Sequence, residues 1–83
     1  MKKRKNWGEK MFKYRVRIET GKDVQNFIKI SESLPFEIKL ENESGTKQGN
    51  AKTLLNVVDT IEWEEVYIIS ETDTYAAFKD FII

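Results

Sequence analysis

The hydrophobic pattern of the chain predicts an α+β fold, an open-faced β-sandwich in which three helices cover one face of a four-stranded antiparallel sheet. Segments of alternating apolar and polar residues predict strands with one polar face. Segments with apolar residues at helical spacing lie between them. Because each alternating strand has one apolar face, the helices must share one side of the sheet, and the 83 residues allow a single small core.

The first half of the domain is predicted to be strand, helix, strand. Residues 12–19 alternate apolar and charged side chains, which is typical of a half-buried strand. Residues 20–23 interrupt this pattern, and Asp23 is expected to cap a helix because its carboxylate can accept hydrogen bonds from unpaired amides. Apolar residues then recur at helical spacing until Pro35 ends the helix, and residues 36–41 alternate again.

The second half is predicted to be strand, short helix, strand, helix. A polar edge strand is expected over residues 46–48, with a turn at residues 49–50. The short helix lies within residues 50–59. The most apolar strand, residues 66–70, is expected to be buried on both faces or flanked by neighbouring strands. Residues 72–74 offer caps for a last amphipathic helix that is expected to run to the end of the chain.

The composition of the chain excludes most catalytic chemistry. It has no histidine, which removes the commonest general base and metal ligand, and no cysteine, which removes thiolates and disulfides. No nucleophile and base pair, glycine-rich phosphate loop or metal-ligand set is recognisable, so we expect no enzyme, no cofactor and no metal. No apolar run is long enough to span a bilayer, and we expect a cytoplasmic protein with no membrane partner.

The charge is divided between a basic N-terminal segment and an acidic body. Residues 1–11 show no hydrophobic period and are expected to form a disordered tail, leaving residues 12–83 as the domain. Five basic residues against Glu9 give residues 1–10 a charge of +4, so residues 11–83 carry −4 because the chain sums to zero. The tail either contacts a polyanion or lies outside the natural protein, if Met11 is the true start. An acidic body argues against a nucleic-acid partner.

Two short segments resemble a known family. Glu19-Thr20-Gly21 follows the first predicted strand, and Lys52-Thr53-Leu54-Leu55-Asn56-Val57-Val58 begins the short helix. Together with the element order, over about residues 12–82, these segments resemble the histidine-containing phosphocarrier (HPr) family of the bacterial sugar phosphotransferase system. A ferredoxin-like fold shares much of this element order and is the structural alternative.

The resemblance implies a phosphocarrier that has lost its working residue. The family has a phosphorylated histidine, followed by alanine, arginine and proline, at the start of the first helix. This chain has a shorter segment there, Gly21-Lys22-Asp23, which would be a degenerate active-site loop. Asp23 could form an acyl phosphate only beside a cationic clamp, so we favour its interpretation as a helix cap.

The resemblance also implies a regulatory residue. Thr53 stands where the family has a serine that a dedicated kinase phosphorylates. A phosphate at a helix start would be stabilised by free amides, so a switch is physically reasonable there. The alternative, which we favour, is that Thr53 is only a capping residue.

The short helix is further expected to carry a docking surface. Leu54, Leu55 and Val58 share one helical face and correspond to aliphatic residues that the family uses to contact partners, whereas Val57 and Ile61 should point at the sheet. All five could instead be core. A short helix cannot easily direct all five at one sheet, so part of the set should be exposed, and exposed apolar clusters usually mark binding.

These observations predict a non-catalytic regulatory or protein-interaction domain related to the phosphotransferase system. It would be unable to carry phosphohistidine and would bind a protein partner through the short helix. The alternative function is that of a degenerate phosphoacceptor, a kinase substrate modified at Thr53.

Overall fold

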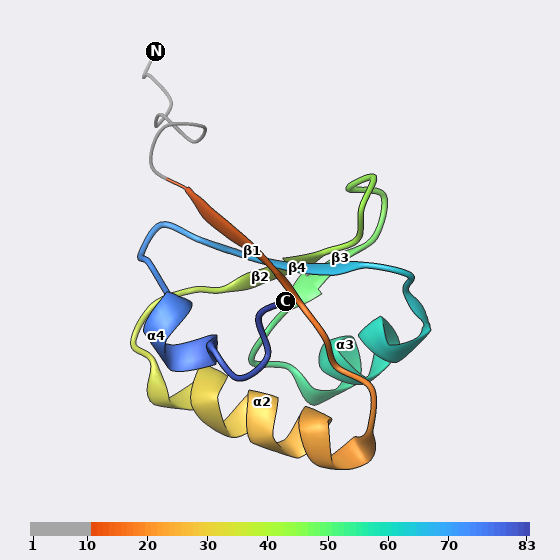
Figure 1. The fold of residues 1–83 in the computed structure, drawn as a ribbon, viewed down its shortest axis with the longest axis horizontal. Helices are drawn as coiled ribbons and strands as arrows, with labels where there is room; N and C mark the ends of the chain where they lie inside the picture. The colour runs from red at the N-terminus through yellow and green to blue at the C-terminus, as the bar shows by residue number, and fades with distance from the viewer. Residues whose placement is uncertain (1–10) are drawn as a thin grey trace.

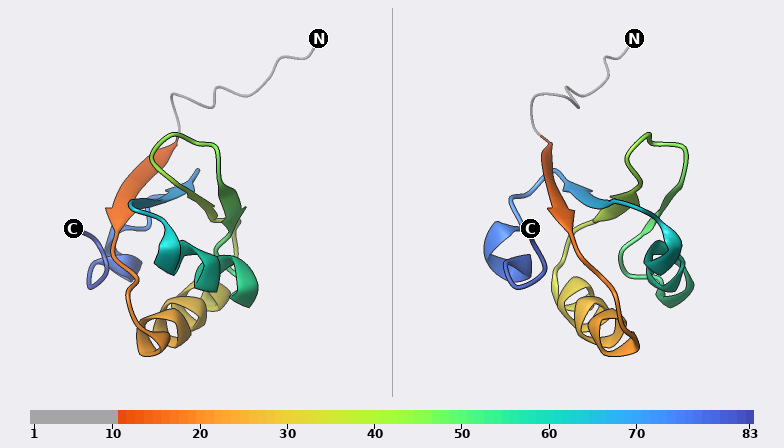
Figure 2. Two further views of the ribbon diagram at one scale, coloured as in Figure 1. Left: turned by 90° about the vertical axis from the view of Figure 1, so that its right-hand side faces the viewer. Right: turned by 45° about the vertical axis from the view of Figure 1, so that its right-hand side comes forward.

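The computed structural model describes residues 11–83, which form an α+β fold with a four-stranded antiparallel sheet and three α-helices (Figure 1). The predicted order of elements is confirmed. In chain order they are β1 (Phe12–Val16), α2 (Gly21–Ser33), β2 (Lys39–Glu41), β3 (Gln48–Asn50), α3 (Leu54–Asp59), the 3-10 helix η1 (Thr60–Glu62), β4 (Val66–Ser70) and α4 (Tyr75–Phe78). All three α-helices lie on the same side of the sheet, with α2 between α4 and α3 (Figures 1 and 2).

The sheet has the strand order β1-β4-β2-β3, and every neighbouring pair is antiparallel. Strand β4 therefore lies between β1 and β2, which confirms the prediction for the most apolar strand. Ile68 at its centre is opposite Tyr14 on one side and Leu40 on the other. Because alternate residues of a strand face opposite sides, this row directs the buried Leu40 and Ile68 side chains toward the helices.

The core lies between this sheet face and α2. Val24, Phe27 and Ser31 form the buried face of the helix, as their spacing predicts. The ring centroids of Phe27 and Phe78 are 4.8 Å apart, and Phe81 lies edge-on to Phe27 at 5.5 Å. Large aromatic side chains dominate the energetics of a small core, so these rings fix α4 against α2.

The C-terminal helix is much shorter than predicted. Helix α4 ends at Phe78, and the chain then turns back along the free edge of β1. Arg17 N–H donates to the Phe81 carbonyl at 2.9 Å, and Ile83 N–H donates to the Arg15 carbonyl at 3.0 Å. The prediction of a helix to the end of the chain is wrong because unpaired backbone groups on the edge of β1 bind these last residues instead.

Strand ends also differ from the predictions. Strand β1 ends at Val16 rather than Glu19, although Ile18 is still buried. The edge strand β3 covers residues 48–50 rather than 46–48, so the predicted turn at residues 49–50 is wrong. The turn that leads into α3 lies later, at residues 51–52, where Lys52 N–H donates to Asn50 Oδ1 at 2.7 Å. Between β2 and β3, Lys47 N–H donates to Asn42 Oδ1 at 3.1 Å and Gly45 adopts a φ of 78°. The bounds of a polar edge strand are hard to predict, because it has no alternating set of buried side chains that would fix its register.

Candidate functional site

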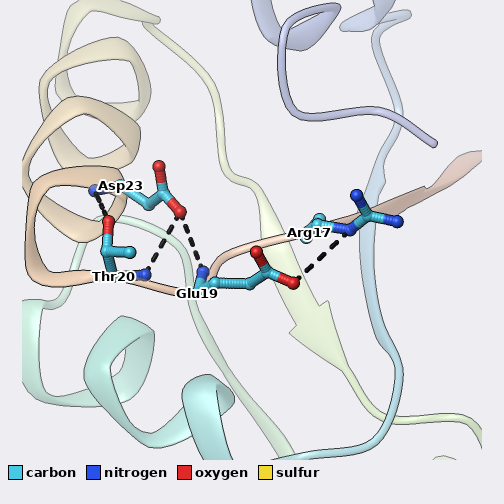
Figure 3. Close-up of polar contacts among 4 residues, drawn as sticks. All are labelled: Arg17, Glu19, Thr20 and Asp23. Carbon is cyan, nitrogen blue, oxygen red and sulfur yellow. Dashed lines mark hydrogen bonds and ion pairs between the residues drawn. The ribbon is translucent and has the colours of Figure 1, made fainter.

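The junction between β1 and α2 is the place where the resemblance puts a phosphate-carrying loop. Helix α2 begins at Gly21, so Gly21, Lys22 and Asp23 form its first turn. Thr20 is the N-cap, and its Oγ1 accepts a hydrogen bond from Asp23 N–H at 3.1 Å. The Asp23 carboxylate accepts in return from Glu19 N–H at 2.9 Å and Thr20 N–H at 3.2 Å (Figure 3). The predictions that residues 21–23 form a loop and that Asp23 is the N-cap are therefore wrong, because Thr20 and Asp23 form a capping box.

This geometry makes the Asp23 carboxylate a structural group. The hydrogen bond from Glu19 N–H is the largest cause that lowers the pKa of Asp23 below its ordinary value of 3.8. The nearby Arg17 guanidinium pairs with Glu19, with Nε at 3.6 Å from the carboxylate oxygen (Figure 3). Both side chains are well exposed, so the pair contributes at most about 1 kcal/mol. A carboxylate held by two backbone amides serves the helix start, which is the role that the residue type favours.

A cleft of about 660 Å³ lies beside this junction, between the start of α2 and the C-terminal segment. Its lining mixes two cations with three carboxylates and several apolar side chains, namely Arg17, Glu19, Asp23, Asn26, Lys29, Ile30, Asp80, Phe81, Ile82 and Ile83. Charges of both signs therefore line this cleft. Its three carboxylates outnumber its two cations, so the charge of the lining does not favour an anionic ligand.

Helix α3 is fixed in place by hydrogen bonds at its start. Asn50 N–H donates to Asn56 Oδ1 at 2.8 Å, which ties the first turn of α3 to the end of β3. Gly49 allows this approach, because a Cβ there would lie 2.9 Å from the Cβ of Asn56. Lys52 Nζ donates to the Leu34 carbonyl at 2.7 Å, so the segment before α3 is also held against the end of α2. These contacts decide which face of α3 points outward.

The outward face of α3 is apolar. The exposed fractions are 56% for Leu54, 72% for Leu55 and 42% for Val58, whereas Val57 is fully buried. The prediction that Leu54, Leu55 and Val58 are exposed is confirmed, and their role in binding stays a prediction. Ile61 is 40% exposed and joins them. We call these four side chains the α3 surface.

The prediction that Ile61 points at the sheet is wrong. Helix α3 ends at Asp59, and the tighter turn of η1 places Thr60 inward in its stead. Thr60 is 1% exposed, and its hydroxyl donates to the Val57 carbonyl at 2.6 Å. A threonine can take a buried position because its hydroxyl finds a backbone acceptor there, a possibility that apolar periodicity alone does not reveal.

Thr53 lies at the edge of the α3 surface. It occupies the N-cap position of α3 and is exposed, but its hydroxyl makes no capping hydrogen bond. Its backbone carbonyl accepts from Val57 N–H at 3.1 Å. Thr53 therefore occupies the N-cap position, but its hydroxyl stays exposed and does not make the capping bond that was favoured from the sequence.

Acidic residues come directly after the α3 surface in the chain and line a second cleft. A cleft of about 270 Å³ separates the β2–β3 turn from the segment after η1, and its lining is Asn42, Glu43, Ser44, Lys47, Glu62, Trp63, Glu64 and Glu65. Despite these carboxylates, residues 11–83 contain no group of three or more His, Cys, Asp or Glu side chains placed to hold a metal ion. Within the same residues, none of the helices combines the length and apolar character needed to cross a membrane.

Comparison of the chain with models of protein families, with characterised proteins and with solved structures gives no significant match.

Proposed function

We propose that this protein is a non-catalytic interaction domain that binds a protein partner through the α3 surface. The observation that supports the proposal is the exposure of four neighbouring apolar side chains, Leu54, Leu55, Val58 and Ile61, on one short segment. In a chain this small, apolar residues are needed for the core, and exposed clusters usually mark contacts with other molecules.

The rigidity of α3 supports the same proposal. The hydrogen bonds from Asn50 N–H to Asn56 and from Lys52 to the Leu34 carbonyl hold the helix before any partner arrives. A partner that packs on Leu55 therefore has little ordering of this domain to offset, and preorganised surfaces bind more tightly for that reason. Burying one leucine fully contributes roughly 1.5–3 kcal/mol, which makes Leu55 the best candidate for a central contact.

We further propose that the domain is a degenerate relative of the HPr phosphocarriers, retained for regulation rather than for phosphate transfer. The element order, the helices on one face of an antiparallel sheet and the segment Lys52–Val58 support this relation. The chain has no histidine, and Gly21, Lys22 and Asp23 belong to a helix, where a carrier of this family would hold its phosphate. Phosphohistidine transfer is therefore not part of the proposed function.

Substitution of Leu55 by glutamate tests the docking proposal. The affinity-tagged protein should capture a defined partner from an extract of its native cells, and Leu55→Glu should abolish that capture because it places a charge at the centre of the α3 surface. Tyr75→Glu is the matched control, since Tyr75 is 51% exposed on α4, on the far side of α2 (Figure 1). Equal capture by the wild type and Leu55→Glu, with circular dichroism showing both folded, would remove the proposal.

Phosphorylation at Thr53 is a second candidate function, favoured by one observation. The Thr53 hydroxyl is exposed and free of a capping bond, directly before Leu54 and Leu55. A phosphate there would add a charge of about −1.5 to −2 beside the α3 surface and alter docking. Mass spectrometry of the protein from its native cells, with Thr53→Val as the negative control, should detect phosphothreonine. If the wild type stays unmodified in all growth conditions, this candidate is lost.

A further inference from the structure

Charge around the α3 surface identifies the chemistry of a partner. Residues 53–65, which contain α3, η1 and the segment after them, hold four carboxylates and neither lysine nor arginine. Asp59 lies one helical turn after Leu55, on the same stripe of α3, and Glu62 follows Ile61 directly. Exposed carboxylates therefore border the apolar side chains, and any partner that covers Leu55 must also meet them.

The acidic border continues onto the neighbouring turn. Glu43 in the β2–β3 turn lines the same cleft as Glu62 and Glu64, with Trp63 between them. Among residues 11–83, neither Glu43, Glu62, Glu64 nor Asp59 has an ion-pair partner. Their charges are thus not neutralised within the described part of the chain.

Cations lie near this region too, but the carboxylates outnumber those that are not already paired with a carboxylate. Arg15 and Arg17 approach Ile61 and Glu64 across a third cleft, but Arg15 pairs with Glu65 at 3.9 Å and Arg17 pairs with Glu19 at 3.6 Å. Lys52, before α3, donates to the Leu34 carbonyl. Lys47 is the one cation among the residues that line the acidic cleft. The net charge of the α3 surface and its border is therefore negative.

We propose that the α3 surface binds a basic amphipathic segment of a partner protein, in which lysine or arginine side chains flank a row of apolar ones. The inference rests on the proposed docking function and adds the charge of the partner to it. Apolar residues of the segment cover Leu54, Leu55 and Val58, while its cations reach Asp59, Glu62 and Glu64. Complementary charges of this kind set partner choice and association rate more than they set affinity.

Other occupants of the α3 surface fit the charge less well. A second copy of the domain would bring the same carboxylates to the interface, because a two-fold contact places one surface against itself. An anionic membrane surface attracts cations, and the border of the α3 surface is acidic. Like charges in close contact suppress association, so both occupants are disfavoured by the same residues.

Two designed peptides test the inference. Both carry leucine at helical spacing, and the remaining positions are lysine in one peptide and glutamate in the other. Fluorescence anisotropy of the labelled peptides should show binding of the leucine–lysine peptide alone. Its affinity should fall steeply between about 0.01 M and about 0.15 M ionic strength, as the Debye length shortens from roughly 30 to 8 Å.

Matched variants distinguish binding through the acidic border from nonspecific binding. Asp59→Asn with Glu62→Gln should weaken binding of the leucine–lysine peptide by about three- to tenfold, the loss expected for two exposed ion pairs. Glu37→Gln with Asp80→Asn removes the same charge at residues that line other clefts and should leave the affinity unchanged. Leu55→Glu should abolish binding of the leucine–lysine peptide. Circular dichroism confirms that each variant is folded.

The outcomes distinguish this inference from the proposed function. If both peptides bind equally and both lose binding in Leu55→Glu, the basic partner is wrong while docking through the α3 surface stands. Equal weakening by the two double variants would also overturn the inference, because it would reflect net charge alone. If neither peptide binds, or if the protein forms dimers that Leu55→Glu dissociates, the basic segment is excluded, and the capture experiment above decides docking separately.

Discussion

At the scale of single residues, two buried hydroxyl groups behave differently. Thr60 is buried with its hydroxyl bonded to the Val57 carbonyl, whereas Ser31 is fully buried in α2 and its Oγ has no hydrogen-bond partner. An unsatisfied buried polar group costs about 1–3 kcal/mol. Ser31 occupies a core position at the expected helical spacing, but its unpaired hydroxyl lowers the stability of the fold.

We expect Ser31→Ala to raise the free energy of unfolding by about 1 kcal/mol, because it removes the unpaired hydroxyl and improves helix propensity. Urea denaturation measures the change. Ser33→Ala is the control, since Ser33 is exposed and its hydroxyl donates to the Ile30 carbonyl at 2.6 Å. A loss of stability in Ser31→Ala would mean that its hydroxyl is satisfied and the expectation is wrong.

At the scale of elements, capping and close approach set where helices begin. The capping box of Thr20 and Asp23 satisfies amides at the start of α2, and the tie from Asn50 N–H to Asn56 sets the position of α3. Neither is a contact between apolar faces. The tie at Asn56 nevertheless places the surface that the proposed function uses, because the start of a helix fixes which side chains point outward along its length.

We expect Asp23→Ala to lower the free energy of unfolding by about 1 kcal/mol near neutral pH. The folded-state pKa of Asp23 lies below its ordinary value of 3.8, so its stabilisation is present above that value and is lost as the pH falls through the folded-state pKa. The difference between wild type and variant should therefore narrow in acid. Urea denaturation over a pH series measures it, with Lys22→Ala as the control. A difference that is constant with pH would contradict the ionised capping box.

Substitution by alanine should change the free energy of unfolding in opposite directions at two glycines. Gly49→Ala should lower the free energy of unfolding by about 1–3 kcal/mol, because the new Cβ would lie 2.9 Å from Asn56 Cβ and push α3 from β3. Gly21→Ala has open space and lies at the start of α2, so it should raise stability by a few tenths of a kcal/mol, up to about 1 kcal/mol. Thermal or urea unfolding compares them. Equal effects would show that the contact between Gly49 and Asn56 does not constrain α3.

At the scale of the whole molecule, the arrangement separates a mixed-charge cleft near β1 and α2 from an apolar surface on α3. Helix α2 lies between α4 and α3, and the last residues of the chain lie along the edge of β1 (Figures 1 and 2). Under the proposed relation to the HPr carriers, the first region corresponds to their phosphate-carrying loop, and in this chain it contains a helix cap. The second remains accessible. A binding function through α3 can therefore exist without a transfer function near α2.

We expect no phosphoryl transfer to this protein. Incubation with the phosphotransferase enzyme I and radiolabelled phosphoenolpyruvate should leave it unlabelled, because the chain has no histidine and Asp23 is held by two backbone amides. A histidine-bearing phosphocarrier in the same reaction is the positive control. Stable labelling of this chain would overturn the proposal of a degenerate carrier.

The amino-acid sequence alone predicts the order of elements, a strand at residues 66–70 that is flanked or buried on both faces, and the exposure of part of the apolar set on the short helix. Periodicity carries this information, because each amphipathic segment has one face to bury. The predicted tail, residues 1–11, falls almost wholly outside residues 11–83 and stays a prediction.

The ends of elements, and the groups that satisfy their free backbone atoms, depend on tertiary contacts instead. Thr20 rather than Asp23 is the N-cap of α2, Thr60 rather than Ile61 is buried, and residues 81–83 lie along β1. Hydrogen-bond partners at the ends of elements come from other parts of the chain or from competing neighbours. A local hydrophobic pattern contains no record of those partners, so it predicts faces better than ends.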